Sequence, residues 1–271
     1  MSERIAFIGG GNMASAIIGG LVSQGYAPSQ IEVVEPFAET RDKLKASYGV
    51  SAQATAGTFL EQAAMVIWAV KPQTFREAAL PVRAHTQKAL HLSVAAGIRS
   101  DSIVSWLGTQ RVVRAMPNTP ALIGKGISAL FARPVVTAAE KQQVMQVMAC
   151  TGELLWLDVE EKLDVVTALS GSGPAYAFYF MEAMTTAGAE MGLTREQAQQ
   201  LAVATFIGAG ELVRSSGESP KVLRQRVTSK GGTTDAAICS MEEDDMQAVF
   251  INALYAARRR AQELGDEFGK A

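Results

Sequence analysis

The pattern of apolar and polar positions changes once along the chain, after Pro134. Before that point, short apolar runs alternate with stretches in which apolar residues recur at helical spacing. The runs that predict strands are residues 4–8, 31–35, 65–70, 89–94 and 111–116, with helical stretches such as 38–48 and 74–84 between them. Short apolar strands separated by helices are typical of a doubly wound α/β fold, in which helices cover a parallel sheet on both faces.

The second half of the chain is predicted to be almost entirely helical. Thr137 and Glu140 form a capping-box pattern that begins a helix running toward Cys150, and residues 152–157 predict one last strand. Further helices are predicted over residues 174–191 and 194–214, from Ser219-Pro220 onward, and over residues 244–268. The first of these is apolar on most faces, which is typical of a helix buried within an assembly. We therefore expect two domains, residues 1–160 and residues 161–271.

A glycine-rich turn directly follows the first predicted strand. Residues 9–14 read Gly-Gly-Gly-Asn-Met-Ala, the pattern G-x-G-x-x-A. Gly9 allows a tight turn, Gly11 lets a pyrophosphate approach the backbone, and Ala14 lets the next helix pack closely on the strand. That helix is expected to begin near Asn12, so that its free N–H groups face the phosphates of a dinucleotide. The alternative is a turn that needs small residues and binds nothing.

An acidic residue, Glu35, ends the second predicted strand, about 20 residues beyond the glycine turn. A carboxylate at this place can bind the ribose hydroxyls of NAD, and it repels the 2′-phosphate of NADP. Arg41, in the helix that follows, is either a phosphate ligand or a solvated helix residue. The residues themselves therefore leave both NADH and NADPH open as the cofactor.

The other predicted strands also end in residues suited to a ligand crevice. Pro72 ends one predicted strand just after Lys71. The side chain of Lys71 either faces a phosphate or a carboxylate or is simply solvated. Small residues at 93–97 leave room for a flat ring or a ribose. Asn118 lies in a loop that two prolines make rigid, and its side chain offers a donor and an acceptor to a nicotinamide. The alternative is that this loop is only a rigid connection.

Two late glycine-rich segments, residues 169–176 and 227–235, interrupt the helical half. In the second, Gly231 and Gly232 precede Thr233 and Thr234, a turn followed by the start of a helix. Successive N–H groups in such a turn form a nest for a small carboxylate. The threonine hydroxyls either cap the helix or donate to a substrate, and as caps alone they need no ligand.

Composition narrows the function classes. The 271 residues carry a formal net charge of −2 with no long run of lysine or arginine, which argues against binding to nucleic acid or to an anionic membrane surface. The first apolar segment reaches glycines after a few residues, so we expect no signal peptide. Cys150 and Cys239 have no partners at metal spacing, and His85 and His91 form no cluster. We expect a cytoplasmic protein without a metal site.

Six segments together resemble the Δ1-pyrroline-5-carboxylate reductase family. They are residues 7–14, 69–72, 93–97, 114–120, 170–176 and 228–234. The resemblance implies a Rossmann-like domain followed by an all-helical domain that dimerises by interleaving, with rings as large as a decamer built from dimers. It also implies reduction of L-1-pyrroline-5-carboxylate to L-proline by hydride transfer from NADPH or NADH, the last step of proline biosynthesis.

The resemblance further implies particular site residues. To the cofactor it assigns Ile8, Gly9, Gly10, Gly11, Asn12, Met13, Ala69, Val70, Lys71, Pro72, Val94 and Ala96, beside Glu35 and Asn118 proposed above. To the substrate it assigns Ser229, Gly231, Gly232 and Thr233, with Thr234 as the proton donor. Two positions depart from the family. NADP-using members often carry small hydroxyl residues where Glu35 stands, and a ribose-side asparagine of some members is replaced near Ala56.

Two other functions remain as alternatives. A β-hydroxyacid dehydrogenase is expected to carry a lysine on the first long helix of its second domain, and residues 175–191 contain none. A nucleotide-binding Rossmann protein without catalysis leaves the segment from Gly231 to Thr234 unexplained.

Overall fold

In the computed structural model, which describes residues 3–269, the chain divides into two compact units. One consists of the residues up to Ser172 together with those from Ala257 onward, and the other of residues 173–256. The last helix therefore contributes to both units. The predicted domains, 1–160 and 161–271, divide the chain slightly earlier and assign that helix to the second domain alone.

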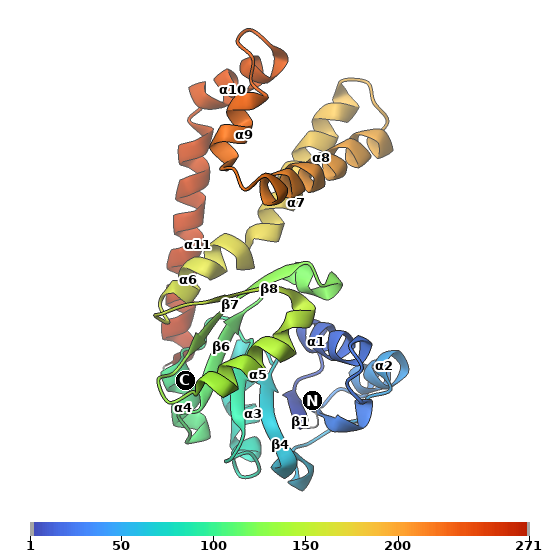
Figure 1. The fold of residues 1–271 in the computed structure, drawn as a ribbon, viewed down its shortest axis with the longest axis vertical. Coiled ribbons are helices and arrows are strands. Elements are labelled where there is room, and N and C mark those ends of the chain that lie inside the picture. The colour runs from blue at the N-terminus through green and yellow to red at the C-terminus, as the bar shows by residue number, and fades with distance from the viewer. Residues whose placement is uncertain (1–2, 270–271) are drawn as a thin grey trace. The chain divides into compact units, whose positions relative to one another are not determined.

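Strands of the first unit form one sheet. Their bounds are β1 Arg4–Ile8, β2 Ile31–Val34, β3 Ala52–Gln53, β4 Ala63–Trp68, β5 Leu90–Ser93, β6 Val112–Met116, β7 Gly126–Ala132 and β8 Gly152–Trp156. The order across the sheet is β3-β2-β1-β4-β5-β6-β7-β8, and neighbouring strands from β3 to β6 are parallel (Figure 1). The chain winds outward in opposite directions from β1 and β4, so the ligand crevice of such a sheet lies beyond the carboxyl ends of these two strands. The predicted Rossmann-like fold class is confirmed.

Helices cover both faces of this sheet and make up the second unit. Their bounds are α1 Asn12–Ser23, α2 Ala38–Tyr48, α3 Pro72–Arg83, α4 Ser100–Leu107, α5 Ala138–Met148, α6 Lys162–Val166, α7 Gly173–Glu190, α8 Arg195–Ser216, α9 Pro220–Arg226, α10 Thr233–Glu243 and α11 Met246–Gly269. Short 3₁₀ turns occupy η1 Pro28–Gln30, η2 Thr58–Gln62, η3 Thr119–Ile123 and η4 Ala149–Thr151, and η5 Thr167–Gly171 is π-helical.

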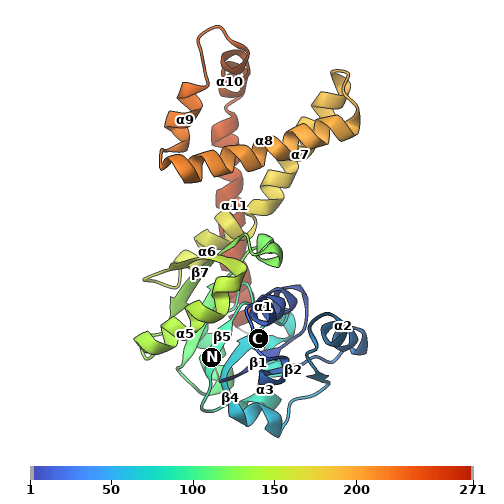
Figure 2. The same ribbon diagram turned by 45° about the vertical axis from the view of Figure 1, so that its right-hand side comes forward.

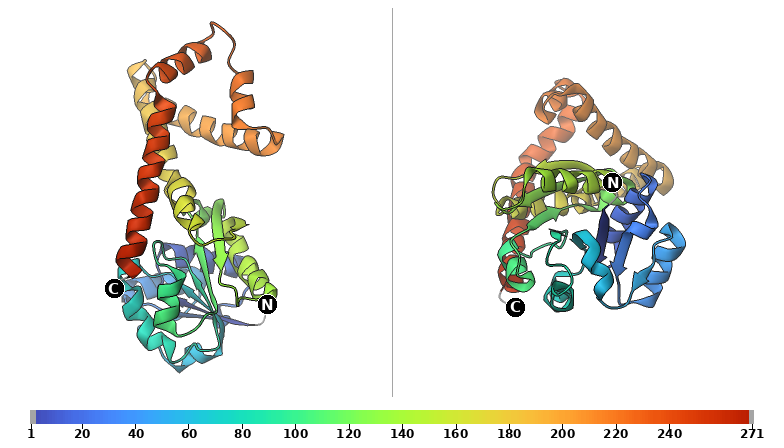
Figure 3. Two further views of the ribbon diagram at one scale, coloured as in Figure 1. Left: turned by 90° about the vertical axis from the view of Figure 1, so that its left-hand side faces the viewer. Right: turned by 60° about the horizontal axis from the view of Figure 1, so that its bottom comes forward.

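Successive side chains of each strand point to opposite faces of the sheet, so the first unit has two hydrophobic cores, one on each face. Phe7 of β1 packs on one face with residues of α1 and α5, whereas its neighbour Ile8 packs on the other face with residues of α3 and α4. The end of α11, drawn in red in Figure 3, joins this second face. There Phe268 packs on the cluster and Leu264 approaches Gly97. Both cores stabilise the sheet edge that carries the glycine turn.

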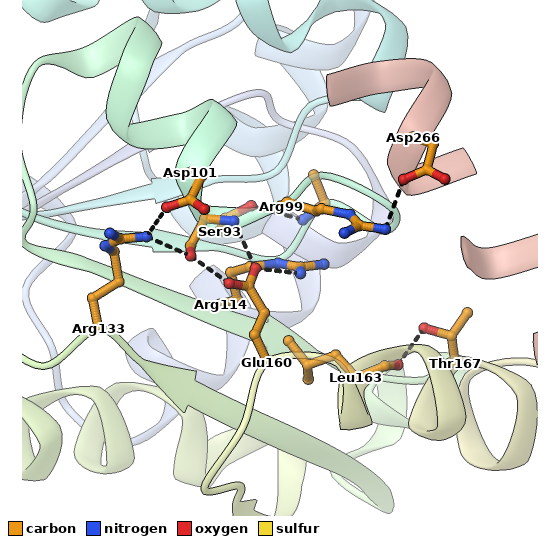
Figure 4. Close-up of polar contacts among 11 residues, drawn as sticks. Ser93, Arg99, Asp101, Arg114, Arg133, Glu160, Leu163, Thr167 and Asp266 are labelled. Atoms are coloured by element: carbon orange, nitrogen blue, oxygen red, sulfur yellow. Dashed lines mark hydrogen bonds and ion pairs between the residues drawn. The ribbon is translucent and has the colours of Figure 1, made fainter. Parts of the chain in front are cut away.

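A buried ion pair fixes the segment that follows β8. Arg114 on β6 is 7% exposed, and its Nη1 donates to Glu160 Oε1 at 2.7 Å. The same carboxylate accepts from the N–H of Ser100 at 2.6 Å and from its hydroxyl, at the first turn of α4 (Figure 4). Arg133 adds a bond to the Ser100 hydroxyl at 2.9 Å. Because Glu160 satisfies both a buried arginine and a helix N-terminus, it locks the chain between β8 and α6 to the sheet.

A buried histidine makes the stability of the first unit depend on pH. His91 on β5 is 1% exposed, accepts at Nδ1 from Trp68 Nε1 at 3.1 Å, and contacts the carbonyl of Thr86 through Nε2. Burial lowers the pKa of His91 to about 4. Between pH 6.5 and 4 the unfolded chain therefore binds a proton that the folded chain refuses, so stability falls as the pH falls through this range.

We expect the free energy of unfolding to drop by about 2–3 kcal/mol between pH 7 and pH 4.5 through this one residue. Urea titrations of the wild-type protein and of His91→Gln at both pH values measure it, because glutamine keeps a donor and an acceptor without titrating. The difference between the two proteins should shrink at the lower pH. A His85→Gln variant, at a partly exposed histidine, serves as the control. An identical pH dependence in wild type and His91→Gln would contradict the assignment.

The second unit is built around a helical hairpin of α7 and α8 (Figure 2). A Cβ on Gly188 would lie 2.8 Å from that of Ala198, so the glycine permits this close crossing. Phe250 of α11 meets the rings of Tyr176 and Phe180 edge-on. Many other apolar side chains of the unit are exposed, among them Phe178, Tyr179, Met191, Leu201, Ile207, Leu212, Val227, Val249 and Tyr255. Within residues 3–269, no helix is both long and apolar enough to cross a membrane.

Candidate functional site

The glycine turn after β1 is held between two neighbouring strands. Gly9 has a φ of +95° and donates its N–H to the carbonyl of Val34 at 2.8 Å. A Cβ at this position would lie 2.6 Å from the carbonyl oxygen of Ala69. Only glycine fits both the backbone angle and this contact, so Gly9 serves the fold of the turn.

The end of the turn opens toward solvent at the N-terminus of α1. Gly11 occupies the N-cap position without a side-chain cap, and a Cβ there would meet no described atom within 4 Å. Gly11 and Asn12 are exposed. The first N–H groups of α1 therefore face open space beside a residue that lacks a side chain. This cradle fits a dinucleotide pyrophosphate, for which helix N-termini supply both donors and a positive dipole end.

Glu35 lies directly behind this cradle. It is 6% exposed, and its Oε2 accepts from the N–H of Gly10 at 2.7 Å while its Oε1 accepts from the N–H of Phe37 at 2.9 Å. Arg41 uses Nη1 to donate to the carbonyls of Glu35 and Pro36, at 2.9 and 2.7 Å. The predicted ribose-binding acid is thus fixed to the main chain of the glycine turn.

The remaining predicted cofactor residues lie at the end of β1, in the first turn of α1, and just beyond the carboxyl ends of β4, β5 and β6. Ile8 and Val94 are buried, Met13, Ala69, Val70, Pro72 and Ala96 are partly buried, and Lys71 is exposed at the N-cap position of α3. Asn118 accepts the N–H of Ile127 at its Oδ1 (3.0 Å), which leaves its amide NH₂ as a donor. The structure therefore brings these residues and the glycine turn to one edge of the sheet, within the first unit.

The late glycine segment forms a second cradle, at the start of α10. Gly231 has a φ of +75°, and Gly232 is the N-cap residue and donates its N–H to the carbonyl of Ser229 at 2.9 Å. No side chain of the described residues caps α10, and neither the Thr233 nor the Thr234 hydroxyl makes a hydrogen bond within residues 3–269. The threonines are therefore not serving as helix caps, and both are exposed. An anion finds free N–H donors and free hydroxyls here.

The sequence interpretation missed one residue of this cradle. Asp235 accepts the N–H of Gly231 at its Oδ2, at 2.8 Å, and so occupies one donor that had been assigned to a substrate carboxylate. The signal was available, because an aspartate in the first turn of a helix commonly bonds preceding N–H groups. Thr233 and Thr234 keep their own N–H groups for a ligand.

Neither cysteine is among the residues proposed for the two cradles, and Cys150 has a structural role. Cys150 packs against the backbone of α1, and burial raises the pKa of its thiol to about 11. At neutral pH it is therefore an unreactive thiol. Cys239, on α10, is exposed.

Family comparisons match both halves of the chain. Residues 160–264 match the model described as pyrroline-5-carboxylate reductase dimerisation. Residues 4–97 match the model described as NADP oxidoreductase, coenzyme F420-dependent. The first range contains the late cradle, and the second contains the glycine turn and Glu35.

Full-length relatives carry the same name. A pyrroline-5-carboxylate reductase of Pseudomonas aeruginosa is 44% identical over 273 residues, with 99% of each chain covered. The solved structure of the Coxiella burnetii enzyme is similar with a TM-score of 0.90 and 38% identity, covering 97% of this chain and 99% of that one. The Plasmodium falciparum enzyme, solved with NADP bound, matches with a TM-score of 0.86 and 25% identity over 97% of this chain and 98% of that one. The chain belongs to the pyrroline-5-carboxylate reductase family.

Proposed function

We propose that this chain reduces L-1-pyrroline-5-carboxylate to L-proline with NADH or NADPH, the last step of proline biosynthesis. The observation that carries the proposal is the 44% identity to a pyrroline-5-carboxylate reductase across the whole length of both chains. The two backbone cradles support it, because the reaction needs one site for a dinucleotide and one for a small carboxylate.

The first cradle binds and orients the cofactor. Gly11 and the first turn of α1 hold the pyrophosphate, Gly10 positions Glu35 through its N–H, Glu35 holds a ribose, and the amide of Asn118 orients the nicotinamide. The nicotinamide, when bound, supplies the hydride that reduces the C=N bond. Excluding water and fixing the angle of attack is the protein's contribution to this step.

The second cradle binds the substrate carboxylate and places a proton donor at the ring nitrogen. Ser229 and the N–H groups of Thr233 and Thr234 receive the carboxylate, while Gly232 shapes the turn through its own bond to the carbonyl of Ser229. The ring nitrogen must carry a proton as the imine becomes an amine, and the Thr234 hydroxyl hydrogen-bonds this nitrogen and relays a proton to it from water, so that the threonine itself stays neutral. A cyclic imine is readily protonated near neutral pH, so a hydroxyl donor is enough and no strong acid is required. This agrees with the absence of a histidine among the residues proposed for either cradle.

The protein works as a homo-oligomer through residues 161–271. Helices α7, α8 and α11 carry many exposed large apolar side chains, and contiguous exposed apolar patches mark interaction surfaces. A dimer that interleaves these helices buries them, and five such dimers make the decamer that we propose. We propose a cytoplasmic location, where the thiols of Cys150 and Cys239 stay reduced.

The test is a turnover assay on the purified full chain. Pyrroline-5-carboxylate is mixed with NADH or NADPH, oxidation is followed by nicotinamide absorbance, and proline is identified by mass spectrometry. We expect proline with at least one cofactor. No turnover with either would end the proposal, and oxidation of a 3-hydroxy acid with NAD(P)⁺ in its place would favour a β-hydroxyacid dehydrogenase.

A further inference from the structure

The carboxylate of Glu35 is held in one orientation. Gly10 and Phe37 each donate an N–H to a different oxygen of it, at 2.7 and 2.9 Å. A side chain on Gly10 would collide with Leu44 and come within 3.3 Å of Glu35 Cγ, so the acid packs directly against the turn that faces the dinucleotide. A group fixed by two main-chain bonds cannot swing aside to admit a second anion.

The hydrogen-bonding capacity left on this carboxylate matches one kind of partner. Two carboxylate oxygens have about four acceptor positions, and the main chain uses two of them. The two acceptor positions that remain need hydrogen-bond donors as partners. A ribose with free 2′- and 3′-hydroxyls offers two neighbouring donors, whereas a 2′-phosphate offers acceptor oxygens and negative charge. The negative charge of Glu35 therefore repels the phosphate, and the acceptor positions of the carboxylate find no donor on it.

The cation nearest in sequence is already used. The Nη1 group of Arg41 bonds the carbonyls of Glu35 and Pro36, which keeps the guanidinium on the main chain of this segment. Lys43, on the same helix, pairs with Glu39 at 2.7 Å. A guanidinium turned toward a 2′-phosphate would compete with the two main-chain contacts that Arg41 Nη1 makes in this structure.

From this geometry we infer that Glu35 makes the chain select NADH over NADPH. The inference rests on the proposed function for the identity of the cofactor, and it goes further by naming the residue that discriminates. It also separates this chain from the Plasmodium falciparum relative, whose structure holds NADP.

Binding, measured without turnover, tests the inference on the wild-type protein. Dissociation constants for NADH, NADPH, ADP-ribose and 2′-phospho-ADP-ribose are measured by calorimetry. We expect each compound without the 2′-phosphate to bind at least about tenfold more tightly than its phosphorylated counterpart. Equal affinities, or tighter binding of the phosphorylated compounds, would overturn the inference.

Variants then assign the selectivity to the residue. In Glu35→Gln we expect NADH to bind about tenfold more weakly and the preference to disappear, because the charge is lost and an amide NH₂ replaces one of the two oxygens that accept from Gly10 and Phe37. Asp42→Asn, which removes a carboxylate from an exposed position of the same helix, should keep the wild-type ratio. Arg41→Gln should leave the ratio within about threefold, and a selective loss of NADPH affinity there would instead make Arg41 a phosphate ligand and refute the inference.

Different experimental results would overturn the NADH selectivity and the proposed reaction. A protein that binds NADH selectively but never forms proline keeps the inference and loses the proposed reaction. A protein that forms proline equally well with both cofactors, at equal affinities, keeps the reaction and loses the inference. A protein that binds neither dinucleotide loses both.

Discussion

Replacing Gly11 with alanine should abolish most dinucleotide affinity while leaving the fold intact. Gly11 has a φ of −68°, which alanine adopts readily, and an added Cβ would meet no described atom within 4 Å. The protein itself therefore tolerates the methyl group. A pyrophosphate that approaches the N-terminus of α1 would not, and we expect NADH to bind about 10- to 100-fold more weakly. Calorimetric titration with NADH and thermal unfolding of the free protein measure the two effects.

The matched control is Gly9→Ala, two residues earlier in the same turn. Its φ is positive, and the added methyl group would lie 2.6 Å from the carbonyl oxygen of Ala69, so this substitution is a folding defect. We expect Gly9→Ala to lose about 2–5 kcal/mol of stability, whereas Gly11→Ala should unfold at the wild-type temperature. A Gly11→Ala protein that binds NADH normally would show that the open space at the helix N-terminus is not the pyrophosphate site.

The strands and helices of the first unit follow local patterns strongly enough to be predicted. The helix over 38–48 has the predicted bounds, and the strand predicted at 65–70 lies at Ala63–Trp68. The latter shift arises because Pro72 begins α3 and does not merely end the strand, so Ala69 and Val70 become the loop. Boundaries depend on where hydrogen bonding stops, which apolar runs alone do not mark.

Strand β7 is the clearest omission. Residues 126–132 read Gly-Ile-Ser-Ala-Leu-Phe-Ala, in which small residues interrupt the apolar run, and the segment pairs antiparallel with β6. An antiparallel partner added to a parallel sheet needs no crossover helix, so the alternation of strands and helices that predicts the other strands is absent here. Gly126 permits the strand to begin against the loop at Ala121, a tertiary contact that sequence cannot reveal.

The site residues were accessible from sequence to different degrees. Backbone cradles leave a signature, because glycine followed by a helix start is readable in one dimension, as at Gly11 and Gly232. What each N–H group already binds is harder to predict. The bond from Gly231 to Asp235 is local and is indicated by an aspartate in the first turn of a helix, whereas the bond from Gly10 to Glu35 joins residues far apart in the sequence and depends on the fold. These bonds turn a candidate ribose ligand into an immobile one, and they remove one donor from the substrate cradle.

The chemical step should depend on one hydroxyl. Thr234 is exposed at the first turn of α10, and its hydroxyl makes no hydrogen bond within the described chain, so it is available to the ring nitrogen of a substrate. Thr234→Ala removes that donor without disturbing a helix cap. We expect kcat to fall about 100-fold with little change in the Kd of NADH, because proton donation contributes in the transition state and not in cofactor binding.

Two further variants separate proton donation from substrate binding and from general damage. Thr233→Ala removes a hydroxyl next to the proposed carboxylate cradle and should raise KM more than it lowers kcat. Ser240→Ala removes a hydroxyl from an exposed position of the same helix and should leave both constants unchanged. Steady-state kinetics with pyrroline-5-carboxylate compares the three. Unchanged kcat in Thr234→Ala would mean that the ring nitrogen takes its proton directly from water, and the role of α10 would then be limited to holding the carboxylate.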